Sequence, residues 1–147
     1  MRRYLDTSLL VAVLIHEAGT TAAKTYLASC GDRPLVISRW VIAEFSSALA
    51  IKVRTGAITA SEQVAALMML RRFRERRLRV LDVEAGDFDA AAGMSDQSGI
   101  PLRAGDALHL AVCVRVAARL ATFDGGLATA AQHHGVATDY LTAQQTA

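Results

Sequence analysis

The feature that most constrains this chain is the alternation of short apolar runs with longer segments of helical patterning. Glycine, proline or helix-capping residues bound each run, so the runs have the length of buried strands and not of helices. The runs lie at residues 2–6, 34–38, 78–83, 119–123 and 136–141. Strands that alternate with helices favour an α/β domain with a mostly parallel sheet between helical layers.

The intervening segments carry recognisable helix ends. Ser38 is placed to cap a long helix at 39–56, and Thr59 with Glu62 forms a capping box at the start of 59–77. Gly19 is expected to end the first helix, and Thr20 or Thr21 to cap the second. The other expected helices are 8–19, 20–32, 84–99, 105–118 and 124–135. We expect one domain over 1–142 and a frayed tail at 143–147.

The composition excludes several classes of protein. Hydrophobic residues make up 52% of the 147 residues, which suits a compact core and leaves little room for disorder. No apolar run is long enough to span a membrane, and Asp6 interrupts the only stretch that resembles a signal peptide. The two cysteines, Cys30 and Cys113, form no CxxC motif. These features predict a soluble, reduced, cytoplasmic protein without a membrane partner.

Four carboxylates are expected at one edge of the sheet. Asp6 follows the first apolar run, and Asp124 follows the run at 119–123. Asp106 opens the helix that leads into that run, and Glu44 lies in an unusually apolar helical stretch. Ligands of open α/β sheets bind beyond the carboxyl ends of the strands, where all four acids would meet.

Each acid also has a simpler interpretation. An aspartate between a strand and a helix is a standard N-cap, and a lone Glu44 would be an exposed residue or an ion-pair partner. Together, however, four carboxylates would repel one another and raise their pKa values, so a counter-charge is needed. Arginine could supply it, but Mg²⁺ or Mn²⁺ would do so directly, since both prefer carboxylate oxygens.

Four segments resemble the signature segments of PIN-domain nucleases, and most closely those of the VapC-type toxin ribonucleases of bacterial toxin–antitoxin systems. They read "YLDTSLL", "VIAEFSSAL", "LRAGDALHLAVC" and "LATFDGGLATAA", and they extend from residue 4 to residue 131. The resemblance implies a three-layer α/β/α sandwich with a five-stranded, mostly parallel sheet. One departure stands in the last segment, where many members carry an asparagine and then an acid three residues later. Here Asp124 and Leu127 occupy those positions.

The resemblance also implies the chemistry. It predicts a Mg²⁺- or Mn²⁺-dependent endoribonuclease that acts as the toxin of a type II pair, blocked by a cognate antitoxin and forming a homodimer. Asp6, Glu44, Asp106 and Asp124 fall on the catalytic, metal-binding positions. Thr7 or Ser8 and Thr122 fall on supporting hydroxyl positions, and Arg103 is a candidate for holding a phosphate or a pocket carboxylate.

A dense basic run is a candidate surface for RNA or a protein partner, although a solvated helix end explains it equally well. It consists of Arg71, Arg72, Arg74, Arg76, Arg77 and Arg79. His109 and Cys113 follow Asp106 at helical spacing, a pattern more typical of a core stripe than of a transition-metal site.

Rival functions fit the residues less well. An aspartyl-phosphate phosphatase needs a second aspartate where Ser8 stands, and a receiver domain needs a downstream lysine, whereas lysine occurs only at 24 and 52. A PIN-fold regulatory module that acts with a DNA-binding partner, and that has little nuclease activity, remains the alternative.

Overall fold

The computed structural model of the chain describes residues 1–97 and 99–144. Residues 145–147 of the predicted tail therefore lie outside the described residues, as does Ser98. The elements are β1 (Arg3–Leu5), α1 (Thr7–Leu14), α2 (Thr20–Ser29), β2 (Leu35–Ser38), α3 (Arg39–Arg54), α4 (Ala60–Arg76), β3 (Leu78–Leu81), α5 (Ala85–Ser95), α6 (Ala104–Arg115), β4 (Arg119–Thr122), α7 (Gly125–His133) and β5 (Thr138–Tyr140).

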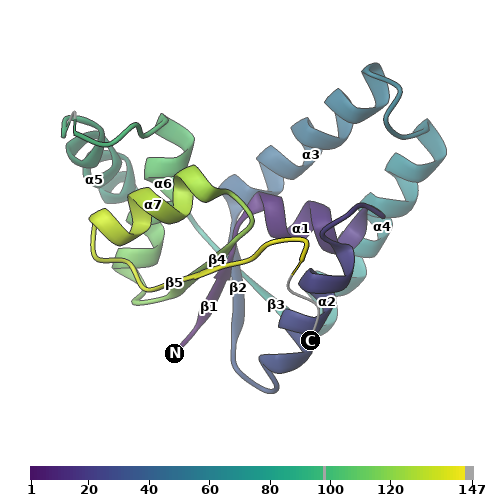
Figure 1. Ribbon diagram of the computed structural model, residues 1–147, viewed down its shortest axis with the longest axis horizontal. Coiled ribbons are helices and arrows are strands. Elements are labelled where there is room, and N and C mark those ends of the chain that lie inside the picture. Colours follow the sequence, from purple (N-terminus) through teal and green to yellow (C-terminus); the bar gives the residue numbers. More distant parts are fainter. Residues whose placement is uncertain (98, 145–147) are drawn as a thin grey trace.

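The five strands form one parallel sheet in the order β3-β2-β1-β4-β5. Right-handed crossovers place helices on opposite faces when the strand order runs in opposite directions from β1. Figure 1 shows this result, with α1–α4 on one side of the sheet and α5–α7 on the other. The predicted three-layer sandwich is confirmed.

The middle of the sheet forms the centre of the core. All four residues of β2 are buried, and Tyr4 and Leu5 of β1 are fully shielded from solvent. A strand covered on both faces reads as a continuous apolar run, which is why these segments were recognisable in the sequence. The edge strand β5 is only partly buried and ends with the exposed Tyr140.

Helix ends were predicted with mixed success. Ser38 caps α3 by accepting the Val41 amide, and the capping box of Thr59 and Glu62 is present at α4. The expectation that the first helix runs to Gly19 is wrong, because the backbone becomes extended at Ile15 and α1 ends at Leu14.

The predicted cap of α2 is also wrong. Gly19 is the N-cap, while the Thr20 hydroxyl accepts the Glu17 amide and donates to the Ile15 carbonyl, so it stabilises the α1–α2 connection instead.

Further along, α5 ends at Ser95 and not near Gly99. No helix among the described residues is long and apolar enough to cross a membrane.

Candidate active site

A cavity opens at the carboxyl ends of β1 and β4, where the strand order reverses direction. This reversal is the topological switch point at which open α/β sheets place their ligands. The cavity has a volume of about 470 Å³, and all four predicted acids line it. They come from four places in the fold: the end of β1, the middle of α3, the first turn of α6 and the start of α7.

Asp6 is the deepest of the four acids, with only 3% of its surface exposed. Its Oδ1 accepts the Leu9 amide at 3.0 Å, so Asp6 caps α1 as the simpler interpretation of the sequence proposed. The hydroxyls of Ser8 (2.7 Å) and Thr122 (2.6 Å) also donate to the carboxylate. Burial raises the pKa of Asp6, although the Thr122, Ser8 and Leu9 hydrogen bonds oppose that rise. Ser8 Oγ also lies 2.9 Å from Oδ2, so each carboxylate oxygen has two contacts, and a cation bound by Asp6 would share or replace one of them.

Ser8 and Thr122 also connect the two halves of the site. The Ser8 hydroxyl accepts the Phe123 amide at 2.9 Å, and the Thr122 hydroxyl accepts the Asp124 amide at 2.9 Å. These bonds join the β1–α1 turn to the β4–α7 turn. The supporting hydroxyls therefore hold the two aspartate-bearing turns in register.

Glu44 is half-buried on α3, and one of its oxygens is held by two side chains. Thr7 Oγ1 donates to Glu44 Oε1 at 2.7 Å, and His109 Nε2 lies 2.5 Å from the same oxygen. Burial alone raises the pKa of Glu44, but the hydrogen bond and charge of His109 and the Thr7 hydrogen bond outweigh it, so the pKa is lowered. The glutamate is therefore ionised in its apolar surroundings.

Asp106 and Asp124 differ in their hydrogen bonding. Asp124 caps α7 by accepting the Leu127 amide at 3.0 Å, again as the simpler interpretation proposed. The cap interpretation is wrong for Asp106, because Arg103 occupies the N-cap of α6 and Asp106 lies in the first turn. Burial raises the pKa of Asp106, and the charges of Asp124 and Glu44 raise it further, against the effect of His109 and Arg103.

The donor set suits a hard divalent cation. Among the described residues, the Asp106 carboxylate has no hydrogen bond or ion pair, while Asp124 and Glu44 repel it, and a cation would relieve that repulsion. No three acids, histidines or cysteines within 1–97 and 99–144 already stand close enough to hold a metal ion. The residue types therefore fit Mg²⁺ or Mn²⁺, and binding would need the side chains to draw together.

The predicted basic residues do not gather at this cavity. Arg103 is exposed beside Asp106, and the cation that lines the cavity is Lys52, whose Nζ lies 3.7 Å from a Glu17 carboxylate oxygen. The arginine run lies on the second half of α4, where Arg71 and Arg74 share a cavity with Ile42 and Ser46 of α3, and it ends with Arg79 on β3. Arg77 donates to the carbonyls of Gly31 and Arg33 in the connection before β2, so it holds a loop at the amino end of the sheet. The run therefore extends from the side of α3 to the amino end of the sheet, and it does not line the acidic cavity.

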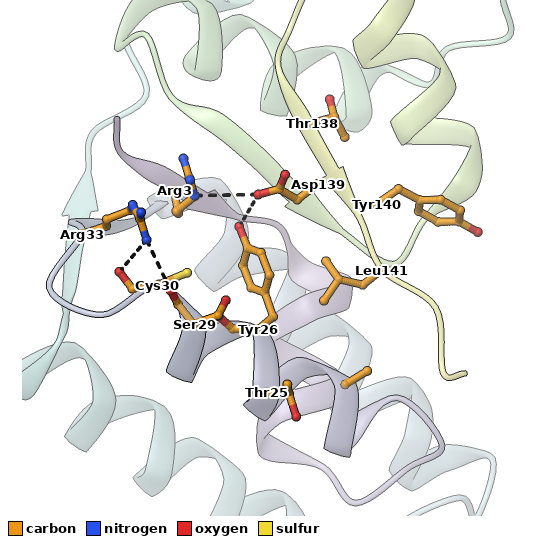
Figure 2. A pocket seen from close by; sticks show the side chains of 11 residues that line it. Arg3, Thr25, Tyr26, Ser29, Cys30, Arg33, Thr138, Asp139, Tyr140 and Leu141 are labelled. Carbon is orange, nitrogen blue, oxygen red and sulfur yellow. Dashed lines mark hydrogen bonds and ion pairs between the residues drawn. The ribbon is translucent and has the colours of Figure 1, made fainter. Parts of the chain in front are cut away.

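A larger cavity, of about 530 Å³, lies between α2 and β5. Figure 2 shows Arg3 and Tyr26 directed toward Asp139, with Tyr26 donating at 2.7 Å and Arg3 forming a 3.7 Å ion pair. Arg119 also pairs with Asp139 at 3.0 Å, and Arg33 donates to the carbonyls that end α2. Because these charged groups are paired within the protein, we interpret this cavity as a structural junction between α2 and the edge strand.

The sequence interpretation missed His109. Its side chain is buried, as a core stripe requires, but its two ring nitrogens contact Tyr4 and Glu44. Ser38, at the end of β2, was likewise treated only as a cap, and Tyr4, on β1, only as part of the first apolar run. The available signal was the position of His109 one helical turn after Asp106, which places both on the same face of α6.

Comparison with known proteins accounts for this arrangement. The family model described as PIN domain matches residues 3–132. The chain belongs to the PIN-domain family. No curated protein matches the sequence, but solved structures share the PIN-domain fold with it.

Three such structures illustrate the likeness. VapC20 of Mycobacterium tuberculosis, described as a sarcin-ricin loop cleaving toxin, has a TM-score of 0.70 and 22% identity, and the match covers 87% of this chain and 94% of that one. VapBC2 of Rickettsia felis, solved bound to a DNA fragment from its promoter, has a TM-score of 0.71 and 17% identity over 97% and 100% of the chains. FitAcB of Neisseria gonorrhoeae has a TM-score of 0.67 and 18% identity over 98% and 99%. At these identities the likeness shows the fold, and the resemblance to the VapC-type fold is confirmed.

Proposed function

We propose that this protein is a Mg²⁺- or Mn²⁺-dependent endoribonuclease that hydrolyses RNA phosphodiester bonds as the toxin of a type II toxin–antitoxin pair. The observation that supports this most directly is the meeting of four carboxylates from four elements in one cavity at the switch point. One of them, Asp106, has its pKa raised by burial and by its acidic neighbours. Unrelieved repulsion of this kind is typical of functional sites.

The proposed roles follow from the contacts. Asp6 and Asp106 would be the main ligands of the cation, with Glu44 and Asp124 completing the set or binding through water. When bound, a divalent cation polarises a phosphoryl oxygen and lowers the pKa of a coordinated water. Thr7, Ser8 and Thr122 orient the carboxylates through the hydrogen bonds described above. Arg103, whose charge acts on Asp106, and Lys52, which lines the cavity, could attract the substrate phosphate.

The arginine run does not line this cavity, and it stays a candidate surface for RNA or for a protein partner. Arg71 and Arg74 lie against Ile42 and Ser46 of α3, on either side of Glu44 in the sequence. Arg77 instead contacts the connection before β2.

Solved structures of similar fold support the proposal that this protein binds a protein partner. VapBC2 of Rickettsia felis was solved with promoter DNA, and FitAB was solved with a DNA fragment. We therefore propose a cognate antitoxin that blocks the cavity and binds DNA, and a homodimeric toxin that acts in the cytoplasm as one domain over residues 1–142. The unpaired thiols Cys30 and Cys113 fit a reducing compartment.

A regulatory module with little nuclease activity is the second candidate. The observation that favours it is that the described acids are not yet gathered as a metal site. In this case the protein would bind its antitoxin and DNA without cleaving RNA.

A cleavage assay distinguishes the two candidates. Purified protein is incubated with RNA hairpins, including the sarcin-ricin loop, in Mn²⁺, in Mg²⁺ and in chelator, beside Asp6→Asn. We expect cleavage by the wild type with metal and none in chelator or by the variant. Cleavage that persists in chelator would exclude the metal mechanism. Absence of cleavage of every RNA, with the antitoxin complex intact, would favour the regulatory module.

A further inference from the structure

We infer that His109 is a positioning residue for Glu44, and that Tyr4 and Ser38 hold it in the orientation this requires. This inference rests on the proposed metal site. The observations that carry it are three contacts: His109 Nε2 to Glu44 Oε1 at 2.5 Å, Tyr4 Oη to His109 Nδ1 at 2.8 Å, and Tyr4 Oη to Ser38 Oγ at 2.8 Å. They form one chain from the end of β2 to the cavity.

This series of hydrogen bonds connects the buried core to the carboxylate of Glu44. Ser38 and Tyr4 have no exposed surface and His109 has 2%. The Ser38 oxygen accepts the Val41 amide at 3.3 Å, so its hydroxyl hydrogen is free to be donated to Tyr4. The Tyr4 hydroxyl contacts both Ser38 Oγ and His109 Nδ1, and His109 Nε2–H faces Glu44 Oε1. Each of these side chains therefore has a hydrogen-bond partner, as buried polar groups require.

Nε2 carries a hydrogen toward Glu44 in either form of the ring. In a neutral imidazole the Tyr4 hydroxyl donates to Nδ1 and so holds the hydrogen on Nε2, and in a charged imidazole both nitrogens carry hydrogens. The rigid hydrogen-bonded ring then fixes the carboxylate, as outer partners commonly do for metal ligands.

Only one oxygen of Glu44 is used in this way. Thr7 and His109 both act on Oε1, while Oε2 accepts no hydrogen bond from the described residues and lies beside Gly105 at the start of α6. Gly105 directly precedes Asp106. Holding Oε1 therefore turns Oε2 toward the helix end that carries Asp106, where a cation shared by the two carboxylates would lie.

The test measures Mn²⁺ affinity directly, by electron paramagnetic resonance of the free ion, together with thermal unfolding of each variant. His109→Leu removes the donor at similar volume, and we expect it to weaken Mn²⁺ binding about 10–100-fold. His109→Gln places an amide N–H near the position of Nε2 and should recover most of that loss. Cys113→Ala is the matched control, because Cys113 is equally buried one turn further along α6 and should keep wild-type affinity.

A double-mutant cycle separates positioning from general stability. If His109 acts through Glu44, the variant carrying both Glu44→Gln and His109→Leu should bind Mn²⁺ no more weakly than Glu44→Gln alone. A further loss in the double variant, or His109→Leu with wild-type affinity, would overturn the inference while leaving the metal site intact. A wild type that binds no Mn²⁺ would overturn the proposed function, and the inference with it.

Discussion

Thr122, the last residue of β4, donates a hydrogen bond of 2.6 Å to Asp6, which directly follows β1. The two residues are 116 positions apart in sequence, yet they lie at the carboxyl ends of the neighbouring strands β1 and β4, at the switch point of the sheet. The bond binds together the two turns that carry Asp6 and Asp124. The same bond holds the carboxylate of Asp6, which is buried and whose pKa is raised by that burial.

Thr122→Val removes this donor and the acceptor of the Asp124 amide at almost unchanged volume. We expect the free energy of unfolding to fall by about 1–3 kcal/mol, because a buried carboxylate loses a partner. Urea unfolding at neutral pH measures the change, and Thr122→Ser, which keeps the hydroxyl, is the control. Equal stability of the two variants would mean that the hydroxyl has no role in holding Asp6.

Asp106→Asn should separate stability from function. Without metal, the substitution removes a charge that Asp124 and Glu44 repel. In chelator, the free energy of unfolding of the variant should therefore exceed that of the wild type by up to about 1 kcal/mol. With metal, the rate of cleavage should fall by about 100-fold or more. Even substitution of a residue that only supports a metal ligand lowers metal affinity or activity by about 10–100-fold. Thermal unfolding in chelator and RNA cleavage in Mn²⁺ check the two halves. A variant less stable than the wild type in chelator would contradict the proposed repulsion.

Asp87 provides a pH-dependent contribution to stability. It is 2% exposed and forms two hydrogen bonds with the Arg115 guanidinium, at 2.8 and 2.9 Å. Burial raises the pKa of Asp87, but the bonds from Arg115 and the Glu84 amide outweigh it, so the pKa is lowered. A lowered folded-state pKa adds stability that is complete above the unfolded-state value of about 4 and is lost as the pH falls through the folded-state value.

Asp87→Asn should therefore lower the free energy of unfolding by about 1–3 kcal/mol at pH 7, a range reduced because Arg115 is partly exposed. The difference from the wild type should shrink as the pH is lowered below about 4. Urea unfolding across this pH range measures it, with Asp89→Asn, an exposed acid on the same helix, as the control. A difference that does not vary with pH would exclude the ion pair as its source.

Tyr26→Phe tests whether the larger cavity is structural. The substitution removes the hydrogen bond to Asp139 that joins α2 to β5, so stability should fall by about 1 kcal/mol. Mn²⁺ affinity and RNA cleavage should be unchanged, because the residue lies outside the acidic cavity. Loss of either property in a folded variant would show that the two cavities act together.

The sequence by itself determined the class of fold and the edge at which the acids meet. Apolar runs of strand length, separated by helices, are compatible with few arrangements, and Asp6 and Asp124 each follow such a run directly. Because parallel strands end at a common edge, their convergence could be predicted without knowing any side-chain contact. Helix ends such as Leu14 and Gly19 were harder to place, since the bonds of Thr20 that stabilise that turn compete with simple capping.

Only the tertiary structure decided which residues act together. His109 contacts Glu44 across 65 positions and Tyr4 across 105. The spacing of His109 from Asp106 shows that both lie on one face of α6, but it does not show which residues of other elements the histidine contacts. The arginine run likewise had no predictable place relative to the acids, because only the packing of α4 against α3 shows that it lies outside the acidic cavity. The physical reason is that local periodicity reports which face of an element is buried, whereas a site is made of contacts between elements, and these depend on how the layers pack.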